Sequence, residues 1–149
     1  MVTVKSGDLL EATENIICHQ VNCFGAAGGL AFDMFERFPD AADQYYAIVD
    51  DYRDKMMRQD LLGCAQVVVV GHLRYVANVF GQYYSGSDYR PDELRKALKV
   101  VAGFAKDNGL SVAIPHKLSC GICGGDWDEV FQIIEEVFED VECVIYKRV

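Results

Sequence analysis

The chain has 149 residues, 51% of them hydrophobic and 25% charged, which are ordinary proportions for a globular protein. Its formal net charge of −9 repels polyanions and argues against general nucleic-acid binding, although backbone N–H groups in a glycine loop can still bind one small anion. No apolar run approaches the roughly 20 residues that cross a bilayer, and the first residues lack the pattern of a signal peptide. We therefore expect a single domain over residues 1–149 that is cytoplasmic and has no membrane partner.

Segments typical of strands alternate along the chain with segments typical of helices. Residues 28–38 and 41–54 carry apolar side chains at helical spacing, and Pro91 suits the first turn of a later helix. The β-branched run at residues 65–70 predicts a buried strand. In chain order, we expect strands at 2–5, 15–21, 65–70, 74–80, 111–114 and 142–146, and helices at 28–38, 41–54, 91–108 and 126–138.

This alternation predicts an α/β fold with three layers, in which a central mixed, mostly parallel sheet is covered by helices on both faces. In such sheets, ligands bind at the carboxyl ends of the strands, beside helix N-termini. We therefore expect a site formed by the loops that follow Val21, Phe80 and Ile114.

Two of these connections are rich in small residues. Residues 22–31 include three glycines and three alanines, which allow close approach of a ligand to the backbone and to a helix N-terminus. Residues 119–127 form the second loop, and Asp126 suits the cap of the helix that follows. Either loop alone can be a tight turn without a ligand. Together, at one end of a sheet, they predict a site for the two halves of a diphosphate.

Six cysteines are scattered among the predicted strands and loops, and without a secretion signal we expect reduced thiols. Cys120 and Cys123 have the C-x-x-C spacing of redox dithiols and of half a zinc site. A zinc site needs a second pair, and Cys18, His19 and Cys23 lack a suitable spacing. We expect no metal and no cofactor, with a redox role of the pair as an open alternative.

Three polar or aromatic side chains have two interpretations each. An imidazole at His19, just after an apolar strand, can act as a general acid or base, or can be a buried histidine with local hydrogen bonds. Asp8 can cap a turn or accept from an exocyclic amine such as that of adenine. Tyr146 can belong to the core or stack on a base.

Four segments, in this order and over nearly the whole chain, resemble the macro domain family. The resemblance implies a domain of α/β/α type that binds ADP-ribose or a derivative, free or attached to a macromolecule. It also implies that Asp8 binds the adenine amine and that Asn22 holds the distal ribose. The segments are Gly7-Asp8-Leu9, residues 17–22 followed by 28–31, residues 78–82, and Ile114-Pro115 followed by residues 119–127.

Within that family, the chain departs from two branches. It lacks the catalytic aspartate that usually follows the first glycine loop, and it lacks the lysine and aspartate of a second branch, which would fall near Gln82 and Cys123. It is more similar to ADP-ribose 1″-phosphate phosphatases, through residues His19, Asn22, Cys23, Gly25, Phe38-Pro39 and Tyr45.

The phosphatase resemblance implies a hydrolase in which His19 assists departure of the phosphate; a non-catalytic ADP-ribose sensor is the alternative. The implied catalytic residues are His19 and Asn22. The implied ligand-binding residues are Asp8, Leu9, Asn22, Gly28, Gly29, Leu30, Ala31, Ser119, Cys120, Gly121, Ile122, Cys123, Gly124 and Tyr146.

Overall fold

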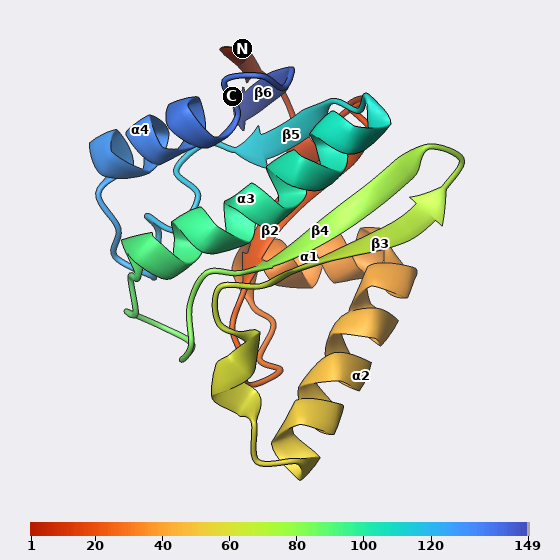
Figure 1. The fold of residues 1–149 in the computed structure, drawn as a ribbon, viewed down its shortest axis with the longest axis vertical. Helices are drawn as coiled ribbons and strands as arrows, with labels where there is room; N and C mark the ends of the chain where they lie inside the picture. Colours follow the sequence, from red (N-terminus) through yellow and green to blue (C-terminus); the bar gives the residue numbers. More distant parts are fainter. Residues whose placement is uncertain (149) are drawn as a thin grey trace.

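A six-stranded sheet forms the middle of the protein in a computed structural model that describes residues 1–148 (Figure 1). The strand order is β1-β6-β5-β2-β4-β3, and every neighbouring pair is parallel except the antiparallel pair of β3 and β4. The strands are β1 (Val2–Ser6), β2 (Ile16–Val21), β3 (Ala65–Gly71), β4 (Arg74–Phe80), β5 (Val112–Pro115) and β6 (Cys143–Lys147).

Helices cover both faces of this sheet (Figure 1). Successive strand residues such as Ile16 and Ile17 enter two different apolar clusters, one packed under α3 and α4 and the other under α1 and α2. The predicted three-layer α/β/α architecture is therefore confirmed. The helices are α1 (Gly29–Arg37), α2 (Pro39–Asp54), α3 (Pro91–Asn108) and α4 (Trp127–Val137), with short 3₁₀ helices η1 (Leu9–Glu11) and η2 (Arg58–Leu61).

The ends of α3 and α4 follow from local chemistry. Pro91 lies in the first turn of α3, and Gly109 ends the helix in the left-handed conformation, at φ 64°. The Asp126 carboxylate accepts from the N–H of Asp128 and caps α4, as predicted. Neither 3₁₀ helix was predicted, because three or four residues carry no helical periodicity.

Within residues 1–148, no helix is both long and apolar enough to span a bilayer.

Strand β3 corrects one prediction. The β-branched run was expected to form a buried strand, but β3 lies at the edge of the sheet, and Val69 is 62% exposed. β-branched side chains favour a pleated backbone whether or not a second strand lies alongside, so the composition does not separate an edge from an interior. A tight turn at residues 72–73 joins β3 to β4, at the amino end of β4.

Candidate functional site

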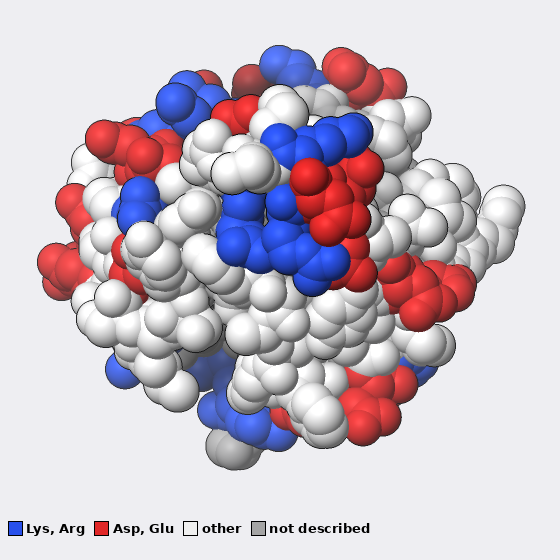
Figure 2. Space-filling model, turned by 90° about the horizontal axis from the view of Figure 1, so that it is seen from below, with Lys and Arg blue, Asp and Glu red and all other residues white. Residues whose placement is uncertain are grey.

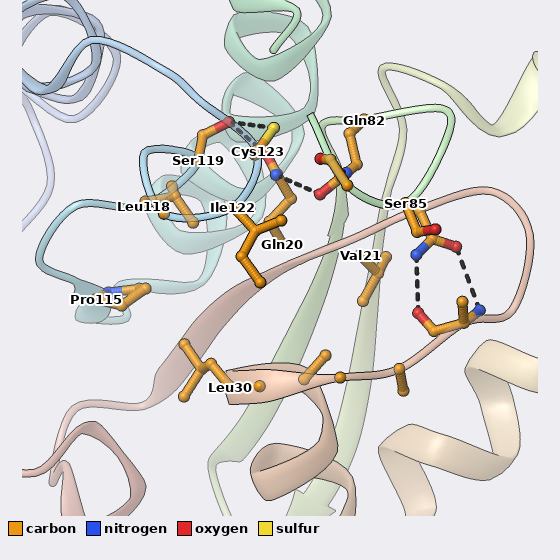
Figure 3. Close-up of a pocket in the computed structure, with 18 of the residues that line it drawn as sticks. Gln20, Val21, Leu30, Gln82, Ser85, Pro115, Leu118, Ser119, Ile122 and Cys123 are labelled. Atoms are coloured by element: carbon orange, nitrogen blue, oxygen red, sulfur yellow. Dashed lines mark hydrogen bonds between the residues drawn. The ribbon is translucent and has the colours of Figure 1, made fainter. Parts of the chain in front are cut away.

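A cleft of about 710 Å³ opens beside the carboxyl ends of β2 and β5 and the loop that follows β4 (Figure 3). Its volume lies in the range of roughly 300–1,000 Å³ typical of small-molecule sites. The walls come from residues 20–22 and 26–31, from Gln82 with residues 85–86, and from residues 115–119 and 121–123. The structure therefore brings together the three loops that were predicted from the alternation of strands and helices.

The first wall is the N-terminus of α1. Gly28, Gly29, Leu30 and Ala31, which the sequence offered as ligand-binding residues, all line the cleft. Gly28 caps α1 without a side-chain hydrogen bond, so the first N–H groups of the helix have no capping acceptor. Gly29 adopts φ +53°, a left-handed conformation that suits glycine. An uncapped helix N-terminus beside a cleft is a ready site for an anion.

The opposite wall is the loop after β5. Ser119, Gly121, Ile122 and Cys123 line the cleft, whereas the predicted Cys120 and Gly124 are absent from its lining. Ser119 has φ +67°, which is unusual for a residue with a side chain and is typical of functional loops. The loop is closed where the N–H of Gly125 donates to the carbonyl of Ser119 at 2.9 Å.

Amide side chains form the floor. The Nε2 of Gln20 donates to Oε1 of Gln82 at 2.8 Å, and the hydroxyl of Ser119 donates to Oε1 of Gln20 at 2.9 Å (Figure 3). The Nε2 of Gln82 donates in turn to the carbonyls of Tyr84 and Gly86. Neither glutamine was predicted as a site residue. Strand alternation was the available signal, because Gln20 follows His19 and must face the opposite side of the sheet.

Asn22 lines the cleft and also orders the first loop. Its Oδ1 accepts from the N–H groups of Phe24 and Ala26, and its Nδ2 donates to the carbonyl of Ala26 at 2.8 Å. The hydroxyl of Tyr45, which is fully buried, donates to the carbonyl of Asn22 at 2.7 Å and lies 3.1 Å from Oδ1. Tyr45 thus holds Asn22 and its loop from the α2 side.

His19 is not brought to the cleft. Its side chain is 0% exposed, its Nε2 lies 2.6 Å from Oδ1 of Asn78, and its ring packs edge-on against Phe35. Burial lowers the pKa of His19 to about 4, against the opposing effect of the hydrogen bond with Asn78. Of the two interpretations of this residue, the position favours the buried histidine. A group in this place does not touch a ligand in the cleft.

The residues expected to bind adenine also lie outside the cleft lining. The carboxylate of Asp8 accepts from the N–H of Leu10 and caps η1, and Leu9 is buried in the core. Tyr146 is 6% exposed and its hydroxyl donates to Glu14 at 2.7 Å. The carbonyl of Tyr146 accepts from the N–H of His116, which lines the cleft, so Tyr146 adjoins the part of the cleft that His116 lines.

The cysteines are all free thiols, Cys120 and Cys123 included. Burial, followed by the nearby Asp126 and Cys123, raises the pKa of Cys120 to about 11, which keeps the thiol protonated and unreactive at neutral pH. Within residues 1–148, no group of three or more His, Cys, Asp or Glu side chains is placed to hold a metal ion.

The cleft is neutral to slightly cationic in a protein of net charge −9. Among the described lining residues there is no carboxylate, and Lys117 is the basic side chain present. Burial lowers the pKa of His116, and Lys147 and Lys117 lower it further, so its imidazole is neutral at pH 7. A negatively charged ligand therefore meets no like charge from these residues.

Fold and site together define a class, a three-layer α/β/α domain with a cleft at the carboxyl ends of its central strands whose lining suits an anionic ligand. The chain belongs to the Macro domain family, whose family model matches residues 18–134.

Relatives and solved structures agree with this assignment. The DNA ADP-ribosyl glycohydrolase of Mycobacterium tuberculosis is 28% identical over 151 residues, covering 98% of this chain; the chain spans 42% of that protein. The macrodomain of Mycobacterium tuberculosis DarG is 27% identical, with a TM-score of 0.82 and coverage of 98% of this chain and 97% of that one. A macrodomain protein from Streptomyces coelicolor is 26% identical, with a TM-score of 0.82 and 98% coverage of both chains.

Proposed function

We propose that this chain binds the ADP-ribosyl group in the cleft described above. The observation that carries the proposal is the pair of facing loops, one of which presents the uncapped N-terminus of α1. The absence of carboxylates from the described lining residues and the presence of Lys117 suit a diphosphate. The family match supports the same ligand.

The orientation of the ligand follows from the two ends of the cleft. Pro115 and Ser85 lie at opposite ends in Figure 3. We place the diphosphate between residues 28–31 and 119–123, with the distal ribose toward Asn22 and Ser85. The adenine then lies toward Pro115 and His116, next to the Asp8 and Tyr146 region.

A calorimetric titration with ADP-ribose tests this proposal, with AMP as the comparison ligand. We expect micromolar binding of ADP-ribose and binding of AMP at least tenfold weaker, because AMP lacks the second phosphate and the distal ribose. Equal affinities for the two ligands, or no heat with ADP-ribose from a folded preparation, would contradict the diphosphate site.

Hydrolysis of an ADP-ribosyl linkage is a second candidate, favoured by the names of the relatives with 28% identity. Because His19 lies away from the cleft and no described lining residue is a carboxylate, hydrolysis here would depend on positioning the substrate and on backbone dipoles. The narrower hypothesis, ADP-ribose 1″-phosphate phosphatase activity, needs a proton donor other than His19.

Chromatographic detection of released ADP-ribose separates the candidates. The protein is incubated with ADP-ribose 1″-phosphate and, separately, with an ADP-ribosylated oligonucleotide. Release from the first supports the phosphatase, and release from the second supports the glycohydrolase. Tight binding of both without any release makes the chain a binding domain.

A further inference from the structure

The carbonyl groups of Tyr84 and Gly86 fix the direction of the hydrogen bonds on the cleft floor. The Nε2 of Gln82 lies 2.6 Å from the first carbonyl and 3.2 Å from the second. A backbone carbonyl can only accept hydrogen bonds, so Gln82 donates both of its side-chain N–H groups to this pair. The Oε1 of Gln82 therefore faces Gln20 and can only accept (Figure 3).

The orientation of the Gln20 amide follows from that of Gln82. The Nε2 of Gln20 faces the Gln82 acceptor at 2.8 Å, so its Oε1 lies on the other side, 2.9 Å from the hydroxyl of Ser119. Ser119 must therefore donate its single hydroxyl proton to Gln20. The same hydroxyl lies 3.6 Å from Sγ of Cys123 and accepts there from the thiol. We call these four side chains the donor series, because each donates to the next, from Cys123 to Gln82.

This common direction leaves most of the donor series with no proton to offer a phosphate. Ser119, Cys123 and Gln82 all line the cleft, yet the hydroxyl proton, the thiol proton and both amide N–H groups are already donated. The spacing of Cys120 and Cys123 thus gains an interpretation that involves no redox chemistry. Cys123 serves as a thiol donor that holds Ser119 in place.

One donor in the series is left over. A side-chain amide carries two N–H groups, and Gln20 donates one of them to Gln82. Within residues 1–148, the second N–H of Gln20 has no acceptor, and Gln20 lines the cleft. A half-buried donor without an acceptor costs free energy, which a ligand that supplies an acceptor recovers. That N–H is therefore available to an oxygen atom of a ligand.

The backbone at Gly81 makes room for the Gln20 amide. A Cβ added to Gly81 would overlap the Oε1 of Gln20 and would lie 3.0 Å from Cδ1 of Leu94. The amide is thus packed against the backbone of Gly81 and is bonded on its other sides to Ser119 and Gln82. A donor that is held in this way before the ligand arrives loses little entropy on binding.

Neutral donors matter here because charged ones are scarce. Figure 2 shows the end of the molecule at which the loops after β2 and β4 lie in Figure 1, and large areas between its charged patches carry no Lys, Arg, Asp or Glu. Among the described lining residues, Lys117 alone carries a full charge, and it adjoins His116 at the adenine end of the ligand as oriented above. The distal half of the ligand therefore meets neutral hydrogen-bond donors.

We propose that Gln20 binds the ligand directly and donates its second N–H to an oxygen atom of the distal half of the ADP-ribosyl group. That oxygen belongs to the distal phosphate or to the ribose joined to it. The inference rests on the proposed function for the ligand and its orientation. Gln20 joins Ser119, in the loop that faces the diphosphate, to Gln82, in the loop that leads to Ser85 at the ribose end. Its amide therefore lies where the two parts of the distal half meet.

The fixed orientation makes Gln20 a specificity-determining residue as well. Because its Oε1 is bonded to Ser119 and its Nε2 faces Gln82, the amide offers a donor to the ligand. A ligand with an oxygen acceptor at this point is favoured over a ligand that places a second donor there.

Calorimetric titrations with AMP, ADP and ADP-ribose test the inference on two variants. Gln20→Met keeps the length of the side chain and removes the donor, and Gln20→Glu keeps the shape and replaces the donor by a charged acceptor. Gln66→Met is the matched control. Gln66 is also a strand glutamine with two hydrogen bonds, to the carbonyl of Gln44 and from Nδ2 of Asn78, but it does not line the cleft.

We expect Gln20→Met to lower the affinity for ADP-ribose by about tenfold or more, as the loss of a hydrogen bond to a charged or strongly polar oxygen requires. Gln20→Glu should lower it further, because a carboxylate also repels the diphosphate. AMP binding should be unchanged in Gln20→Met, since AMP lacks the distal half. An equal loss for ADP assigns the contact to the distal phosphate, and a loss confined to ADP-ribose assigns it to the ribose. Gln66→Met should bind all three ligands as the wild type does.

A second measurement uses the wild-type protein and does not depend on the folding of a variant. In heteronuclear NMR spectra, the side-chain amide of Gln20 gives two proton resonances. We expect one of them to move downfield when ADP-ribose binds, while the proton bonded to Gln82 changes little. The side-chain amide of Gln66 is the internal reference.

Three results would overturn the inference: full ADP-ribose affinity in a folded Gln20→Met protein, an equal loss of AMP affinity in that variant, or amide protons of Gln20 that do not move on binding. In each case ADP-ribose still binds the wild type, and the proposed function stands. If the wild type binds no ADP-ribose, the proposed function fails and this inference fails with it.

Discussion

The Nε2 of His19 and the Oδ1 of Asn78 lie 2.6 Å apart inside the protein and join β2 to β4 through their side chains. The Nδ2 of Asn78 donates to the carbonyl of Ala41 and to Oε1 of Gln66, so Oδ1 is the atom that faces the imidazole. The Nε2 of His19 therefore carries a proton, and its buried Nδ1 has no hydrogen-bond partner within residues 1–148. Because burial lowers the pKa of His19 to about 4, the imidazole is neutral at pH 7. This arrangement gives His19 a structural role.

The stability of the protein should depend on pH through His19. Burial holds the pKa of His19 at about 4 in the folded state, below the ordinary histidine value of 6.5 that applies in the unfolded chain. Between pH 4 and pH 6.5 the unfolded chain binds a proton that the folded chain does not. The contribution of the neutral His19 to the free energy of unfolding is therefore complete above pH 6.5 and is lost as the pH falls to 4. We expect His19 to account for a loss of roughly 3 kcal/mol over this range.

Urea unfolding from pH 7 to pH 4 measures this effect, with His19→Gln as the comparison because glutamine can still donate to Asn78. The unfolding free energy of the wild type should fall more steeply than that of the variant. Parallel curves would show that His19 does not titrate as its burial requires. ADP-ribose affinity at pH 7 should be nearly unchanged in the variant, provided that it folds.

Tyr45→Phe should destabilise the first glycine loop, residues 22–31, because Tyr45 holds that loop through its hydroxyl. The substitution removes the hydroxyl that donates to the carbonyl of Asn22 and accepts from the N–H of Gly25, and leaves those groups without that partner. We expect a loss of about 1–3 kcal/mol in unfolding free energy and weaker ADP-ribose binding. Tyr46→Phe is the control, because Tyr46 is 40% exposed and is expected to change stability by less than about 0.5 kcal/mol. Similar losses in both variants would deny Tyr45 this role.

Gly28→Asp should separate helix stability from ligand binding. Gly28 has an extended backbone suited to a capping aspartate, and nothing lies within 4 Å of an added Cβ. The carboxylate would cap α1 and repel a phosphate, so stability should rise by a few tenths of a kcal/mol while ADP-ribose affinity falls at least tenfold. Gly28→Asn caps without charge and should lose less affinity. Equal affinities of the two variants in calorimetry would mean that the N-terminus of α1 does not bind the diphosphate.

Gly125→Ala should distort the second loop. An added Cβ would lie 2.5 Å from the carbonyl oxygen of Ser119 and 2.7 Å from the ring of Tyr89, and the backbone carbonyl cannot move without opening the loop. We expect a loss of about 1–3 kcal/mol in unfolding free energy and at least tenfold in ADP-ribose affinity.

Gly103→Ala on α3 is the control for that variant, because nothing lies within 4 Å of its added Cβ. It should raise stability by up to about 1 kcal/mol and leave binding unchanged. If Gly125→Ala binds ADP-ribose like Gly103→Ala, the closed shape of the loop is not needed for the ligand.

Much of the fold was predictable because its elements are long and periodic. The predicted bounds of α3 and β4 match the structure, since Pro91 and Gly109 mark the ends of α3 by their backbone chemistry. The position of β3 at the sheet edge was not predictable, because side-chain pattern does not report which strands become neighbours.

The sequence predicted the loops that line the cleft by their backbone, but it did not predict which side chains point into the cleft. Gly28 and Gly29 have no side chain, so a ligand can approach the backbone of this loop closely, and both residues line the cleft. His19 drew attention as an ionisable group, yet the side chain one residue on, Gln20, faces the cleft. Successive residues of a strand point to opposite faces of the sheet, so only one of His19 and Gln20 can face the cleft. The sequence does not state which of the two it is, because the order of the strands in the sheet is known only from the structure.

The turn at residues 72–73 lies at the amino end of β4 (Figure 1), whereas the residues that line the cleft lie beyond the carboxyl end of that strand. Both turn residues are exposed, and Asn15 holds the turn through a bond to the carbonyl of Leu73. A peptide inserted between these two residues points away from every loop that builds the cleft. The molecule can therefore be anchored to a sensor chip by this turn, with its cleft facing the solution.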